Sequence, residues 1–173
     1  MQTPRLTSLQ MSLYNAISFQ LVWWSGVLWG NASLLFVGAL LAIHLFLSAQ
    51  KRADMVLIFR VTVLGMGIDC LLMLLNIFDF NEFPYWLVII WALFSLSLHY
   101  SLSWLRHLPR YLQAVFGAVA GSLSYLAGAR FDAMTLPYGE SVTVIVLCVI
   151  WSVLLPVTVV LAHMHPLKQP QVQ

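Results

Sequence analysis

The sequence predicts an all-α protein, a polytopic bundle of six transmembrane helices. Of its 173 residues, 61% are hydrophobic and only 8% are charged, whereas about 25% are charged in a typical soluble domain. The mean hydropathy is +0.90, and the few charged residues gather in short segments between long apolar runs. Because so few charges cannot cover a soluble surface of this size, lipid is expected to surround much of the chain.

The first two helices are predicted from one long apolar run. A hydrocarbon core about 30 Å thick needs about 20 helical residues to cross it, and residues 9–48 contain no Lys, Arg, Asp or Glu. Because the run is twice as long as one crossing, the chain must reverse inside it. Gly30 and Asn31 are turn residues, and Trp29 beside them favours the membrane interface. Helices are therefore expected near residues 10–30 and 32–49.

Four more helices are predicted from the apolar runs that follow. Polar or charged loops at residues 50–54, 79–84, 106–110 and 129–140 separate these runs. Pro84 ends the second of these loops and is suited to a helix start. The helices are expected near residues 55–77, 85–105, 111–128 and 141–163.

The basic residues orient this predicted bundle. If the N-terminus is inside, seven of the eight Lys and Arg residues lie on or near the cytoplasmic side, and only Arg130 lies outside. Because cytoplasmic loops carry the excess of Lys and Arg, both termini are expected in the cytoplasm. The chain then divides into a cytoplasmic N-terminus at residues 1–9, a transmembrane domain at residues 10–163, and a flexible cytoplasmic tail at residues 164–173.

Five polar residues at membrane depth are candidates for an intramembrane site. Asp69 lies near the centre of the third helix, and Asn76 is expected on the same face. An ionisable residue at this depth costs roughly 2.5–3.5 kcal/mol, so Asp69 is either a proton, ion or substrate site or a structural residue bonded to another helix. The same alternatives apply to His99, Asn15 and His44, which lie on the fourth, first and second helices.

Two further groups of residues stand out. Tyr125 and Arg130 lie at the outer end of the fifth helix, where Arg130 could bind an anionic head group or pair with Asp132. The second group consists of glycine pairs at the spacing G-x-x-x-G. Because small residues let helices pack closely, these glycines are expected to pack against other helices of the bundle or, as the alternative, against a second copy of the chain. These residues are Gly26, Gly30, Gly117 and Gly121.

Motifs for several activities are missing from the sequence. It contains no G-x-S-x-G, H-E-x-x-H or P-loop pattern, so no cofactor and no metal are predicted, and an enzyme is the less favoured class. The net charge of +2 is small and dispersed, which argues against a nucleic-acid partner. The expected partners are the lipid bilayer, a lipid-like ligand, and a second copy or another membrane protein.

Several stretches form a recognisable pattern when they are taken together. They include residues 65–69 and 99–105, and the most specific is Ser124-Tyr125-Leu126-Ala127-Gly128-Ala129-Arg130. Their order, over residues 13–160, resembles the bacterial family of domain of unknown function 2878. The resemblance implies a small polytopic membrane protein, mainly of Gram-negative bacteria, and hence an inner-membrane location. It implies no activity.

Three functions of different classes remain open. The first, and the favoured one, is the binding or transport of a lipid-like or small amphipathic molecule in a pocket within the bundle. The second is an accessory subunit that packs through its glycine faces, and the third is a lipid-modifying membrane enzyme with Asp69 or His99 as acid–base groups. A cavity near these residues favours a ligand or a substrate, whereas a filled core favours the accessory subunit.

Overall fold

The computed structural model describes residues 6–164, which contain α-helices and short 3-10 helices but no strand, so the all-α prediction is confirmed. The expectations for residues 1–5 and 165–173 lie outside the described residues. The elements are α1 (Ser8–Trp29), η1 (Gly30–Ser33), α2 (Leu34–Leu47), α3 (Lys51–Leu74), α4 (Tyr85–His99), η2 (Ser103–His107), α5 (Arg110–Arg130) and α6 (Gly139–His163).

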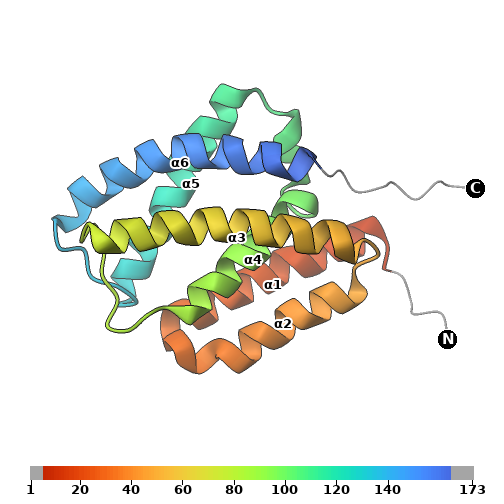
Figure 1. Ribbon diagram of the computed structural model, residues 1–173, viewed down its shortest axis with the longest axis horizontal. Coiled ribbons are helices and arrows are strands. Elements are labelled where there is room, and N and C mark those ends of the chain that lie inside the picture. The colour runs from red at the N-terminus through yellow and green to blue at the C-terminus, as the bar shows by residue number, and fades with distance from the viewer. Residues whose placement is uncertain (1–5, 165–173) are drawn as a thin grey trace, which may run out of the picture.

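The first two helices form a hairpin (Figure 1). A capping box starts α1, because the Thr7 backbone N–H donates to the Gln10 side chain and the Gln10 N–H donates to Thr7 Oγ1. The chain reverses at Gly30, whose φ of 54° favours glycine. Gly30 was expected to pack between helices, but its closest contact would be Trp86 Nε1, at 3.9 Å from an added Cβ atom. Its part in the fold is the turn.

The short helix α4 lies at the centre of the bundle. It contacts α1, α2, α3 and α6, and every residue from 91 to 98 is buried. A helix that is apolar on all sides is typically a buried one, which matches the composition of α4. The helix ends at His99, before the predicted boundary at residue 105, and the 3-10 helix η2 follows after a short turn.

The number of apolar helical segments differs from the prediction. Within residues 6–164, four segments are long and apolar enough to cross a membrane, namely Ser8–Leu47, Lys51–Leu74, Arg110–Arg130 and Gly139–His163, and the shorter α4 is a fifth apolar helix. The prediction of six separate transmembrane segments was therefore wrong. The two helices of the hairpin, α1 and α2, count as one segment, because η1 continues the helical hydrogen bonding through the turn between them. With 15 residues, α4 is about 22 Å long, which is shorter than a full crossing.

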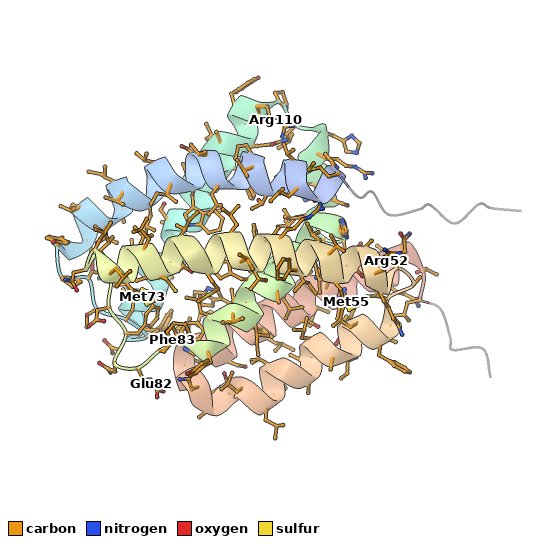
Figure 2. All side chains as sticks on the ribbon, in the orientation of Figure 1. Arg52, Met55, Met73, Glu82, Phe83 and Arg110 are labelled. Carbon is orange, nitrogen blue, oxygen red and sulfur yellow. The ribbon has the colours of Figure 1, made fainter. Side chains whose placement is uncertain are left out.

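Large apolar side chains cover the outside of the long helices. On α6, Ile145, Val149 and Val153 follow one another at intervals of four residues, and each is more than 60% exposed. Such a row on the outer face of a helix is suited to contact with lipid. Figure 2 shows side chains projecting outward from the bundle, with Arg52 near the start of α3 and Glu82 in the loop that follows this helix. The long apolar helices are those of a membrane-embedded protein.

Candidate functional site

A cavity, here called the aromatic pocket, lies between α1, α4, α5 and α6. Its volume is about 430 Å³, which is within the usual range for sites that hold a small organic molecule. Among the residues that the structure describes, none that lines the pocket is charged. The nine aromatic residues in its wall are Phe19, Trp23, Trp24, Trp86, Trp91, Phe94, Phe116, Tyr125 and Trp151.

Three of the glycines singled out from the sequence lie against tryptophans of this wall. A Cβ atom on Gly26 would lie 2.3 Å from the Trp86 ring, and one on Gly121 would lie 2.2 Å from the Trp151 ring. A Cβ atom on Gly117 would lie 2.4 Å from the backbone oxygen of Trp151. Because these distances leave no room for a side chain, the glycine faces are occupied inside the bundle.

The Asp69 carboxylate does not line the pocket, but it binds two residues that do. It is 1% exposed, and it accepts hydrogen bonds from Trp91 Nε1 and from the Tyr125 hydroxyl, both at 2.6 Å. One turn earlier on α3, an added Cβ atom on Gly65 would lie 2.3 Å from the Trp91 ring. One carboxylate on α3 therefore fixes the positions of an indole from α4 and a phenol from α5.

A second buried carboxylate, Asp54, lies in the first turn of α3. Its Oδ2 accepts hydrogen bonds from Ser48 Oγ at 2.5 Å and from the Tyr100 hydroxyl at 2.8 Å, and its Oδ1 lies 3.0 Å from His99 Nδ1. His99 Nε2 lies 3.3 Å from the backbone oxygen of Ala162. Both ring nitrogens of His99 therefore face acceptor oxygens. We call Ser48, Asp54, His99 and Tyr100 the Asp54 cluster.

Sequence reasoning missed Asp54, because residues 50–54 were read as a charged loop. The structure places Lys51–Asp54 in the helix instead. A usable signal was present, since the buried positions of α3 recur every three or four residues at Asp54, Leu57, Val61, Gly65 and Asp69. Extending the inward face of Asp69 toward the start of the helix reaches Asp54.

The structure does not bring Asp69 and His99 together. His99 pairs with Asp54, which is fifteen residues before Asp69 on the same helix. Asn15 lies apart from Asp69 as well, and its Oδ1 accepts a hydrogen bond from Ser101 Oγ at 2.5 Å. The expected single polar site is thus divided between two places along the bundle.

His44 lies close to the Asp54 cluster, but neither of its ring nitrogens has a hydrogen-bond partner among the described residues. Its ring centroid is 5.8 Å from that of Tyr14 and 5.0 Å from that of Tyr100, and its side chain is fully buried. The tyrosine rings thus enclose this imidazole through ring contacts.

Two other expected associations are not formed. Asn76 lies past the end of α3, is exposed, and has a φ of 55°, so the turn removes it from the Asp69 face. Arg130 forms an exposed ion pair with Glu140 at 2.6 Å, whereas Tyr125 points toward Asp69. The predicted outer-face pair of Tyr125 and Arg130 is therefore separated.

The chemistry available in the aromatic pocket is that of binding. Apart from its aromatic and aliphatic groups, it offers the Gln20 amide, the Ser124 hydroxyl and the Tyr125 hydroxyl. Within residues 6–164, no three His, Cys, Asp or Glu side chains come together in a way that could hold a metal ion. Cys70 and Cys148 are free thiols.

The comparisons with known proteins give one match. A family model described as "Protein of unknown function (DUF2878)" matches residues 12–157, which confirms the resemblance seen in the sequence. All residues that line the aromatic pocket lie within the matched range. No curated protein and no solved structure matches the chain.

Proposed function

We propose that this chain, which belongs to the family of unknown function DUF2878, binds one small, uncharged and largely apolar molecule within a membrane. The aromatic pocket carries this proposal, because it combines a volume of about 430 Å³ with nine aromatic residues and no charged residue. Such concave, mostly apolar cavities with a few polar groups are the usual form of small-molecule sites. Binding of this kind is also the first step of transport.

The hydrogen bonds around the pocket support an uncharged ligand. The two oxygens of Asp69 already accept from Trp91 and Tyr125, and no cation lines the wall. A charged ligand would therefore remain without a counter-ion in an apolar site, which is strongly unfavourable. A single hydroxyl or carbonyl group on the ligand could bond to Ser124 or Gln20.

The charge distribution supports placement in a bacterial inner membrane with both ends of the bundle in the cytoplasm. The start of α1 and the end of α6 lie at the same side of the bundle (Figure 1). The loops that the sequence predicts as cytoplasmic contain Lys51, Arg52, Arg106 and Arg110, whereas Arg130 belongs to a loop predicted on the outer side. An excess of Lys and Arg marks the cytoplasmic side.

Photolabelling tests the binding proposal. The protein in lipid nanodiscs would be exposed to the uncharged photoprobe 3-trifluoromethyl-3-phenyldiazirine, and the labelled residues would be mapped by mass spectrometry. We expect labelling of Tyr125 and Trp151 in the pocket to saturate with probe concentration. Labelling of Val149 and Val153, on the exposed face of α6, should rise in proportion to the probe.

A matched pair of variants on α5 makes this test specific. Ala120 lines the pocket, whereas its neighbour Val119 is 53% exposed and does not. Ala120→Phe should remove most of the saturable labelling, since the added ring takes up space that the ligand needs. Val119→Phe should leave it unchanged. Labelling of Tyr125 that never saturates in the wild type would contradict the proposal.

An accessory subunit is the second candidate function. It is favoured by the observation that both Asp69 and His99 have partners on neighbouring helices, as a purely structural role requires. Unsaturable labelling at the pocket would support this candidate. A membrane enzyme has less support, because Asp54 and His99 do not line the pocket.

A further inference from the structure

We infer that the ligand of the aromatic pocket is dissolved in the membrane and enters from the lipid between α1 and α5, past a hydrogen bond from Trp23 to Ser124. This inference rests on the binding function proposed above. It adds the route of entry, the physical state of the ligand before it binds, and the two residues that close the entrance.

The exposure of the lining residues shows where the pocket opens. Four lining residues are exposed, and they are Gln20 and Trp24 on α1 and Phe116 and Ala120 on α5. The lining residues from α4 and α6 are buried or half-buried. The opening, here called the side entrance, therefore lies between α1 and α5.

The backbones of α1 and α5, on the two sides of the side entrance, do not pack closely against each other. In contrast to α5 and α6, which pack along their length, α1 and α5 have almost no close backbone contact. One ring contact joins the two sides, with Trp24 of α1 against Phe131, the residue after α5, at 5.2 Å between ring centroids. The gap can therefore widen without disrupting a packed helix pair.

One hydrogen bond crosses the side entrance from α1 to α5. Trp23 Nε1 on α1 donates to Ser124 Oγ on α5 at 2.9 Å, joining residues that are 101 positions apart in sequence. Both side chains also line the pocket. An incoming ligand must pass this bond, and a hydroxyl or carbonyl group on the ligand can accept the indole N–H afterwards. The ligand is thus expected to be largely apolar with one hydrogen-bond acceptor.

The surface around the side entrance is suited to lipid. On α1, Ile17 is 60% exposed and Leu21 is 44% exposed, and on α5, Val115, Val119 and Leu123 are each more than 50% exposed. A continuous apolar surface on both sides of an opening marks contact with hydrocarbon or another apolar partner. Lipid is the partner that the long apolar helices provide for, so the ligand reaches the pocket from the bilayer.

Spin labelling tests whether the side entrance faces lipid. A nitroxide would be attached at Gln20→Cys, with Cys70 and Cys148 replaced by Ala, in nanodiscs. We expect more frequent collisions with oxygen, which concentrates in lipid, than with a water-soluble nickel chelate. Labels at Val149→Cys on the outer face of α6 and at Glu82→Cys in a loop provide the lipid and water references. A label at position 20 that matches the Glu82 reference would overturn the inference.

Pulsed photolabelling tests the hydrogen bond across the entrance. Protein and photoprobe would be mixed and flashed after increasing delays, with labelling of Tyr125 as the readout. We expect Trp23→Phe and Ser124→Ala to speed the labelling about threefold to tenfold, the range expected for losing one hydrogen bond. The controls Trp29→Phe, on an exposed ring, and Ser152→Ala, whose hydroxyl bonds within its own helix, should keep the wild-type rate.

The two experiments separate failure of the route from failure of the binding proposal. If wild-type labelling of the pocket never saturates, the binding proposal fails, and this inference fails with it even where the spin label reports lipid. If labelling saturates but both entrance variants label at the wild-type rate, the role of Trp23 and Ser124 is overturned while the pocket stands.

Discussion

The two buried carboxylates of α3 have different surroundings, and the difference separates two tasks. Asp69 accepts from two neutral donors, Trp91 and Tyr125, which form part of the pocket wall. Asp54 lies about 22 Å away along the helix axis, where a histidine, a serine and a tyrosine surround it.

The partners define what each carboxylate does. Around Asp54, the contacts join α3 to the residues that follow α2 and to the ends of α4 and α6, so the cluster ties helix ends together. Around Asp69, the contacts orient two aromatic side chains beside a cavity. Loss of the Asp54 carboxylate should therefore mainly reduce stability, whereas loss of the Asp69 carboxylate should reduce both stability and ligand binding.

The largest effect is expected from Asp54→Ala. This change leaves the buried hydroxyls of Ser48 and Tyr100 without their acceptor and removes the partner of His99 Nδ1, and each buried group left unpaired typically costs about 1–3 kcal/mol. The free energy of unfolding, measured by titration with a denaturing detergent, should fall by about 3 kcal/mol or more. Glu82→Ala, in an exposed loop, should change it by less than about 0.5 kcal/mol. A loss below about 1 kcal/mol for Asp54→Ala would contradict the stabilising role assigned to Asp54 and with it the contrast between the two carboxylates.

A smaller loss of stability is expected from Asp69→Asn. The amide offers one acceptor oxygen where Trp91 and Tyr125 both donate, so one donor is left unpaired at a cost of about 1–3 kcal/mol. Saturable photolabelling of the pocket should also weaken, because the wall residues lose their fixed positions. Asp79→Asn, at an exposed side chain, is the control. Unchanged photolabelling in Asp69→Asn would separate this carboxylate from the pocket.

The smallest effect is expected from Tyr100→Phe, which removes one of three donors to Asp54. Two donors remain, so the unfolding free energy should fall by about 0.5–1.5 kcal/mol. Tyr125→Phe should cost more, because no other side chain donates to the same oxygen of Asp69. Tyr111→Phe, on a tyrosine that is 67% exposed, serves as the reference. The reverse order of the two losses would show that the two remaining donors to Asp54 do not compensate for the Tyr100 hydroxyl.

The fold class followed from the composition, but the partners of the polar residues did not. Hydrophobicity and turn residues located the helices and the reversal at Gly30, because both depend on local chemistry. The segment count failed because a 3-10 turn can reverse the chain without ending helical bonding. His99 was grouped with Asp69 because position along a helix does not reveal which neighbouring helix a side chain meets.

The pocket shows a second limit of sequence reasoning. The indole N–H of Trp91 is a donor that needs an acceptor when it is buried, but the sequence does not show which residue supplies that acceptor. Its acceptor, Asp69, was identified as buried and polar, but no local pattern links residues on different helices. Glycine spacing was visible in the sequence, whereas the tryptophan rings that lie against Gly26 and Gly121 emerge only from the packing of the whole bundle.

The central position of α4 has a consequence for how the protein is made. Its neighbours α1, α2 and α3 are synthesised before it, but α6 is synthesised later, so α4 must wait in the membrane with one side unpaired. Its Ser95 and Ser97 hydroxyls donate to backbone oxygens of the same helix. The side that α6 later covers carries the rings of Trp91 and Phe94, which contact Trp151. Because these rings are apolar and the serine hydroxyls are satisfied within the helix, α4 can face lipid until α6 is in place.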